Sequence, residues 1–160
     1  MGAGEVVLRY LHLIALVVWV GGVIFFSLVA APTLFQSLPR EVAGRATSVI
    51  FPRYYLVGGI AAGVALLTAA AIGLTAGRFS RALVVEIVLI ALMGGMTIFA
   101  GQVILPEAQR IRMTLPSIEG SPEHPAAQAR WAVLHRRSVG LNGAVLVLGL
   151  ATLWIVARRP

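Results

Sequence analysis

Apolar residues fill this sequence in four long runs, without the strict alternation of strands or the single apolar stripe of surface helices. Charge or proline bounds the runs, which cover residues 6–31, 54–77, 82–105 and 138–157. A helix rises about 1.5 Å per residue, so about 20 apolar residues cross the hydrocarbon core of a bilayer. Membrane β-strands are about ten residues long and alternate in polarity. The pattern predicts an all-α fold: an integral membrane four-helix bundle that forms one domain over residues 1–160.

The three predicted connections differ in length and composition. Residues 32–53 are expected to include a short interfacial helix at 39–50, and residues 77–81 to form a tight turn. A long polar loop is predicted at about 107–137, with a flexible Pro/Gly/Ser-rich centre between helical extensions of its two neighbours. Four spans place both termini and the tight turn on one side (the terminal side) and the two longer connections on the other (the loop side). No internal repeat is apparent.

Composition strengthens the membrane prediction and removes several function classes. Hydrophobic residues make up 59% of the chain and charged residues 12%, whereas soluble domains average about 25% charged residues. The chain has no cysteine, which excludes disulfides, thiolate metal sites and cysteine nucleophiles. A net charge of +7 would suit nucleic acid, but the arginines stand at the ends of the apolar runs, where lipid headgroups lie. The expected partner is therefore the lipid bilayer and not nucleic acid.

The arginines also bear on orientation in the membrane. Eight lie on the loop side and five on the terminal side, the latter being Arg9, Arg78, Arg81, Arg158 and Arg159. The positive-inside rule then favours a cytoplasmic loop side in the cell inner (plasma) membrane, although the tight turn and the C-terminal tail are basic too. The first apolar run, 22 residues from Tyr10 to Ala31, exceeds a signal-peptide core of about 7–15 residues, so we expect it to remain as a span.

Small residues mark expected helix contacts. Gly59 and Gly63 form a GxxxG pair in the second span, a spacing that lets helices approach closely in membranes. Further small residues follow in the second, third and fourth spans: Ala70, Gly73, Gly77, Gly94, Gly95, Gly140, Gly143 and Gly149. We expect these positions to pack within one bundle, with a homo-oligomer or a larger membrane complex as the alternative. Trp19 is expected to pack beside Gly21 and Gly22.

Two ionisable residues fall inside predicted spans. His12 lies early in the first span and Glu86 early in the third, both near the terminal side. Ionisable groups in a membrane are costly and usually face the bundle interior, so each is a candidate functional residue. A hydrogen bond between them is expected if the first and third spans approach each other.

More polar chemistry gathers at the loop side. His135, Ser138 and Asn142 share one helical face, and the other helix ends add further polar residues at the same depth. The resulting candidate cluster is Tyr54, Gln102, Glu107, Arg110, His135, Ser138 and Asn142. It suggests a proton- or cation-handling site, and the alternative is a network that satisfies helix ends and orients the long loop. No phosphate loop, nucleophile elbow or HExxH motif is present, so no enzyme is predicted.

Metals and haem are weakly supported by the residue types. His12 and His135 stand near opposite ends of antiparallel spans, most of a bilayer apart, so the two cannot share one ion or haem. Met93 and Met96 suit a soft ion such as Cu(I), but two methionines among aliphatic residues also suit packing. No cofactor is predicted, and haem and copper stay open as alternatives.

An ordered set of short motifs resembles the transmembrane protein 205-like family. The motifs are His12 with Trp19-Val20-Gly21, Leu38-Pro39-Arg40, Phe51-Pro52-Arg53-Tyr54, Pro106-Glu107 with Arg110, and His135-x-x-Ser138-x-x-x-Asn142. The resemblance implies a small four-helix membrane protein of unestablished activity, with metal or drug tolerance suggested by eukaryotic relatives associated with resistance to platinum drugs. The first span also resembles, more loosely, that of copper-resistance protein D. The chain lacks matched histidines at one depth, which weakens the implied haem or copper chemistry.

Three functional hypotheses follow. The first is a transporter, or an accessory subunit, that handles or exports a metal cation or small amphiphile. The second is a structural or partner-binding subunit of a membrane complex, and the third is a haem- or quinone-linked membrane protein. Transporters commonly use inverted repeats and broken helices. Neither is apparent in this sequence, so transport would need an oligomer.

Overall fold

The computed structural model describes residues 2–158, and within that range all regular structure is helical. The helices join end to end into four rods of 35–38 residues, each long and apolar enough to cross a membrane. This arrangement confirms the predicted all-α four-helix membrane bundle. Arg159 lies outside the described residues. In chain order the elements are α1 (Ala3–Phe25), η1 (Phe26–Ala30), α2 (Ala31–Ser37), α3 (Arg40–Thr75), α4 (Arg81–Phe99), η2 (Ala100–Ile104), α5 (Leu105–Thr114), η3 (Leu115–Ile118) and α6 (His124–Arg158).

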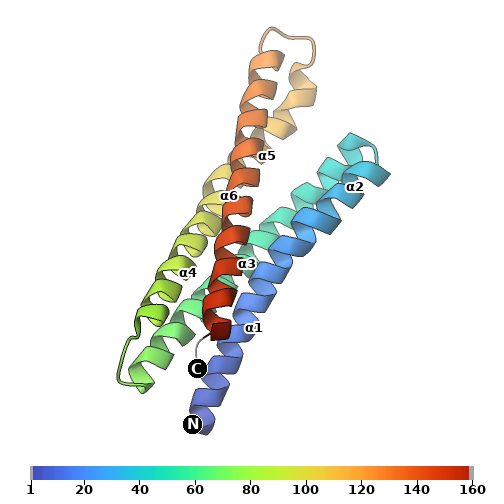
Figure 1. The fold of residues 1–160 in the computed structure, drawn as a ribbon. Coiled ribbons are helices and arrows are strands. Elements are labelled where there is room, and N and C mark those ends of the chain that lie inside the picture. Colours follow the sequence, from blue (N-terminus) through green and yellow to red (C-terminus); the bar gives the residue numbers. More distant parts are fainter. Residues whose placement is uncertain (1, 159–160) are drawn as a thin grey trace.

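The rods form a ring in which α1 contacts α3, α3 contacts α4, α4 contacts α6, and α6 returns to α1. The start of α1, the end of α6 and the α3–α4 turn lie at one end of the bundle, while α2, α5 and the α5–α6 connection lie at the other (Figure 1). The α1–α3 and α4–α6 hairpins diverge toward that loop side in the view of Figure 1. The predicted separation into a terminal side and a loop side is therefore present.

Two of the rods widen into a π-helix just before a proline. η1 precedes Pro32 and η2 precedes Pro106, with Ala31 N–H donating to the Phe26 carbonyl and Leu105 N–H to the Ala100 carbonyl. Proline lacks an N–H, and its ring clashes with the carbonyl four residues earlier. The i→i+5 bonding of a π-helix offsets the backbone at that point. Each rod therefore continues through its proline as α2 or α5.

The two halves of the chain repeat this plan of span, π-helix, proline and returning helix. Pro106 follows Pro32 by 74 residues, and Glu86 follows His12 by the same 74. Most equivalent positions carry different side chains, which explains why no repeat is apparent in the sequence. Parallel repeats of this kind are related by an axis along the membrane normal. Equivalent residues on α1 and α4 that face this axis therefore meet at the bundle centre.

The connection predicted at residues 32–53 is almost entirely helical. The separate interfacial helix expected at 39–50 is wrong, because α3 runs unbroken from Arg40 to Thr75 with Pro52 inside it. Pro52 leaves the carbonyl of Ser48 without its usual helical donor. The Gln109 side chain of α5 supplies that donor, with Nε2 2.9 Å from the Ser48 oxygen. At 107–137, α5 and α6 likewise extend beyond the apolar runs and leave the short connection Glu119–Glu123.

Because Gln109 replaces the donor that Pro52 lacks, the contribution of Gln109 to stability should depend on Pro52. Gln109→Leu is expected to lower the free energy of unfolding by about 1–3 kcal/mol, because the part-buried Ser48 carbonyl loses its donor. In a Pro52→Ala background the residue-52 N–H can bond Ser48 directly, so the same Gln109→Leu change should then cost much less. Denaturant unfolding of the four proteins in detergent measures this difference. Equal costs in the two backgrounds would contradict the claim that Gln109 replaces the donor missing at Pro52.

The helix contacts use some of the predicted small residues and not others: Gly94 and Gly149 pack against neighbouring helices, but the GxxxG pair does not. Side chains added at Gly59 or Gly63 would meet nothing within 4 Å, so the GxxxG pair does not pack inside the bundle. The face of α3 that does pack includes Gly58, Ala62 and Ala65. A Cβ at Gly94 of α4 would lie 3.3 Å from the Ala62 Cβ, and one at Gly101 would lie 2.7 Å from the Tyr55 Cβ.

The expected position of Trp19 is corrected in the same way. Gly21 and Gly22 have open space beside them, and Trp19 instead packs between Gly58 and Gly94. The indole is a member of the hydrophobic core that α1 and α3 share with α4 and α6. Small residues on α3 and α4 therefore make room for a large one on α1.

Candidate functional site

His12 and Glu86 meet near the centre of the bundle. Nε2 of His12 on α1 lies 2.7 Å from Oε1 of Glu86 on α4, and the side chains are 1% and 0% exposed. The helices that carry them occupy opposite corners of the ring, so the contact crosses the bundle axis. The close contact between His12 and Glu86 that their shared depth allows is present. Its functional role stays a prediction.

The third helix of this site fixes the histidine tautomer. Nδ1 of His12 lies 2.9 Å from the Thr68 hydroxyl and 3.1 Å from the Ala65 carbonyl, both on α3. The Thr68 hydroxyl hydrogen is already directed to the Val64 carbonyl at 2.7 Å, and a carbonyl can only accept. Nδ1 therefore carries a hydrogen and donates it.

With Nδ1 protonated, His12 and Glu86 need one further proton between them to make their 2.7 Å contact a hydrogen bond, because two lone pairs would otherwise face each other. They form either an imidazolium–carboxylate pair or a neutral imidazole–carboxylic acid pair, and both forms have zero net charge. Such a pair can exchange a proton within the membrane without burying a net charge. Both His12 nitrogens already contact protein groups, so the residue does not fit the role of an axial haem or copper ligand.

The candidate cluster on the loop side separates into two parts. Tyr54, Asn142 and Ser138 belong to one hydrogen-bonded network between α3 and α6, which Tyr55 completes. The Tyr54 hydroxyl donates to Asn142 Oδ1 at 3.1 Å, and Asn142 Nδ2 donates to the Tyr55 hydroxyl at 3.2 Å. The Tyr55 hydroxyl is also 2.9 Å from Ser138 Oγ. The network therefore joins the α1–α3 hairpin to the α4–α6 hairpin.

The other four predicted members lie outside this network. Glu107 pairs with Arg130 at 2.7 Å and is 3.8 Å from Arg110, while Gln102 is exposed. The exposed His135 ring stacks on Trp131, with ring centroids 5.2 Å apart. The predicted grouping of His135, Glu107 and Tyr54 around one ion is therefore not formed. No group of three or more His, Asp or Glu side chains placed to hold a metal is found among residues 2–158.

Sequence reasoning missed Tyr55 and Gln109. The predicted cluster includes Tyr54 but not its neighbour Tyr55, although the centroids of the two rings lie 5.1 Å apart and both hydroxyls reach α6. The available signal was the position of Tyr55, three residues before Gly58 and seven before Ala62, which places it on their side of α3. Gln109 carried no local signal, because its partner carbonyl lies 61 residues away.

A pocket of about 300 Å³ opens beside Trp19, toward the loop side of α1, α3 and α4. Trp19 is 3% exposed, and its indole Nε1 is buried without a hydrogen-bond acceptor among the described residues. Val18 and Val57 line the mouth and are 46% and 48% exposed on the outer surface of the bundle. The mouth therefore faces lipid. Arg53, Tyr54 and Thr97 supply the remaining polar groups in the wall.

Comparison with known proteins gives one match. The family described as a domain of unknown function, DUF4149, matches residues 14–115, which is well over half of the chain. The matched segment contains all the described residues that line the pocket beside Trp19, but neither His12 nor α6. The match gives no specific support to the transmembrane protein 205-like family or to copper-resistance protein D. No curated protein and no solved structure matches the chain.

Proposed function

The chain belongs to the DUF4149 family of domains of unknown function, and from the geometry beside Trp19 we propose that it binds a small amphiphile taken directly from the lipid. The single observation that carries this proposal is the buried indole N–H of Trp19, which finds no acceptor within residues 2–158, in the wall of a membrane-facing pocket. A buried donor without an acceptor costs about 1–3 kcal/mol. Water cannot supply that acceptor within the hydrocarbon core. A ligand with an acceptor oxygen would remove this cost.

The shape and lining of the pocket define the ligand class. Its volume of about 300 Å³ lies at the lower end of the range for small-molecule sites, about 300–1,000 Å³. The wall is mainly apolar, and its polar groups come from few residues. The ligand is therefore small and largely apolar, with a carbonyl, ether or hydroxyl oxygen that accepts from Trp19.

Arg53 indicates how a ligand would be oriented in the pocket. It lies three to four residues from Val57 and Ile50 on the same helix, and one guanidinium nitrogen donates to the Val49 carbonyl at 3.2 Å. Arginines at this level of a span reach the lipid headgroups with their remaining donors. A polar or anionic head would lie at Arg53 while the apolar body extends toward Trp19. The donor set favours an amphiphile over a metal cation.

Trp19→Phe tests the proposal most directly. This change removes the N–H and keeps an aromatic ring, so we expect about threefold to tenfold weaker binding from the loss of one hydrogen bond. The probe is 2-methyl-1,4-naphthoquinone, which offers carbonyl acceptors on a small apolar frame and finds no cysteine to alkylate. Calorimetric titration of protein in lipid nanodiscs gives the affinity. Mass spectrometry of solvent extracts from purified protein would identify a co-purifying native ligand.

Two matched controls separate the pocket from general effects. Trp154→Phe changes a tryptophan outside this pocket and should leave the affinity unchanged. Gly58→Ala places a Cβ 3.3 Å from Trp19 Nε1 and should weaken binding, whereas Gly59→Ala fills open space and should not. Equal affinity in all of these variants would refute the proposal. A stable dimer in native mass spectrometry would then favour the structural or partner-binding alternative, for which Gly59 and Gly63 leave an open face.

A further inference from the structure

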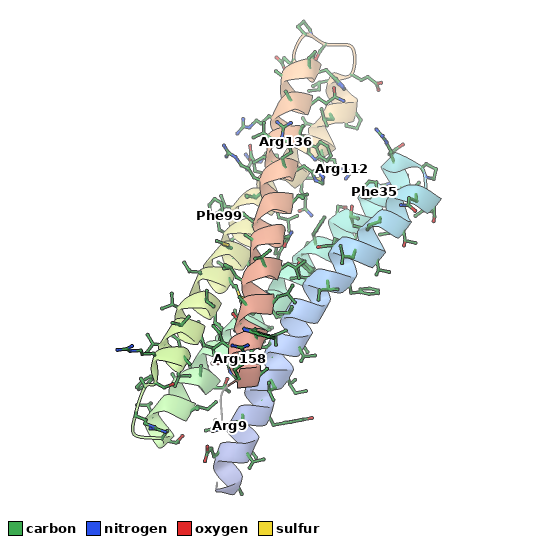
Figure 2. The ribbon with its side chains drawn as sticks, viewed as in Figure 1. Arg9, Phe35, Phe99, Arg112, Arg136 and Arg158 are labelled. Atoms are coloured by element: carbon green, nitrogen blue, oxygen red, sulfur yellow. The ribbon has the colours of Figure 1, made fainter. Side chains whose placement is uncertain are left out.

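A second pocket, of about 520 Å³, lies on the terminal side among α1, α6 and the α3–α4 turn. Three arginines from these three segments line it: Arg9, Arg78 and Arg158. Figure 2 shows Arg9 and Arg158 near the end of the bundle that carries the chain termini. The floor includes the buried apolar residues Ile72 and Leu83. None of the described residues that line the pocket is acidic.

The arginines are only partly neutralised by the protein. Arg9 pairs with Glu5 at 3.0 Å. The Arg158 guanidinium stacks over the Trp154 ring, 4.2 Å from its centroid, a contact that uses the face of the guanidinium and leaves its edge donors available. No ion pair of Arg78 or Arg158 is found within residues 2–158. The pocket therefore has an excess of positive charge.

The start of α4 adds to this charge. Ser80, the N-cap of α4, and Ala82 both line the pocket. The first N–H groups of a helix have no carbonyl partner within it and carry a partial positive charge. Ser80 Oγ accepts from Leu83 N–H at 3.3 Å, which orders this first turn. Guanidinium groups and helix amides thus surround one space above an apolar floor.

We propose that this pocket binds a phosphate group. Guanidinium groups make charge-assisted, often bidentate hydrogen bonds to phosphate oxygens, and the N-terminus of α4 favours an anion. Arg9 lies one turn before His12, and Leu83 one turn before Glu86, so the site lies between the buried pair and the terminal-side surface. That depth and the apolar floor suit a phosphate carried by a lipid headgroup, and the charges alone suit free phosphate. The site is separate from the Trp19 pocket and does not depend on its ligand.

Ligand-dependent thermal unfolding of the full chain in neutral detergent tests this site. The probes are dioctanoyl phosphatidylglycerol, dioctanoyl phosphatidylcholine and inorganic phosphate, each titrated while the melting temperature is recorded, because a ligand of the folded state raises it. The variant is Arg78→Gln with Arg158→Gln. The matched control is Arg81→Gln, which changes an exposed arginine near the same turn that does not line the pocket.

We expect phosphatidylglycerol to raise the melting temperature and the paired variant to weaken this effect about tenfold or more in concentration, since two charge-assisted contacts are lost. Arg81→Gln should stay within about twofold of the unchanged protein. Stabilisation by phosphatidylglycerol over the other probes identifies a lipid headgroup, and equal stabilisation by inorganic phosphate identifies a free phosphate. Stabilisation by none of the probes, or an equal loss in Arg81→Gln, would overturn the proposal.

Discussion

His12→Leu is expected to lower the free energy of unfolding by about 3–5 kcal/mol, because the fully buried Glu86 carboxyl then loses its imidazole partner. Leucine keeps most of the side-chain volume, so a cavity contributes little to this loss. Glu86→Leu should be destabilising as well, since His12 Nε2 then faces an apolar side chain at the bundle centre. The measurement is denaturant-induced unfolding in detergent micelles.

The combined variant, His12→Leu with Glu86→Leu, tests whether the two single variants lose stability because they break the same contact. Replacing both members of a buried pair with apolar residues is often neutral or stabilising, so the double variant should be more stable than either single one. Glu107→Leu is the control, because its pair with Arg130 is partly exposed and such pairs contribute at most about 1 kcal/mol. If the two single costs simply add, the pair is not coupled and the central role assigned to it fails.

Gly101→Ala is expected to lower the free energy of unfolding by about 1–3 kcal/mol, because its new Cβ would lie 2.7 Å from the Cβ of Tyr55. The Tyr55 Cβ is fixed by the α3 backbone, so the two helices must separate. Separation also moves the Tyr55 hydroxyl from Ser138 and Asn142 on α6, which weakens the network between the hairpins.

Gly95→Ala is the matched control on the same rod. A Cβ at Gly95 meets nothing within 4 Å, so this change should be neutral or stabilise the helix by up to about 1 kcal/mol. Thermal unfolding of the two variants in one detergent makes the comparison. A loss at Gly95 as large as that at Gly101 would show that the close contact between the helices is not the cause.

The sequence by itself determined the number of spans, their all-α character and the shared side of the termini. These features depend on the length and hydropathy of local segments and on the thickness of the bilayer, none of which requires a contact map. Depth along the bundle was also determined, since His12 and Glu86 lie at one level because of their distances from the terminal-side ends of their spans. Their meeting across the bundle axis needed the ring order of the helices.

Only the tertiary structure decided which face of each span points inward. Lipid is as apolar as a protein core, so residues on both faces of a span are hydrophobic and the pattern does not distinguish them. Gly59 and Gly63 were therefore predicted on the packed face of α3, while Gly58, Ala62 and Ala65 occupy it. The inward face is instead set by close packing and by hydrogen bonds to distant residues, such as the contact of His12 with Thr68.

The candidate residues predicted from the sequence differ from those that the fold brings together for the same reason: the sequence does not show which face of a span points inward. Tyr54, Ser138 and Asn142 take part in the contact between α3 and α6, whereas Glu107 pairs with Arg130 and His135 stacks on Trp131. Continuity of α3 through Pro52 depends on Gln109, and the two pockets depend on residues from three segments each. Hydropathy along one chain gives position across the membrane, but contact between helices requires the rotation of each helix about its own axis.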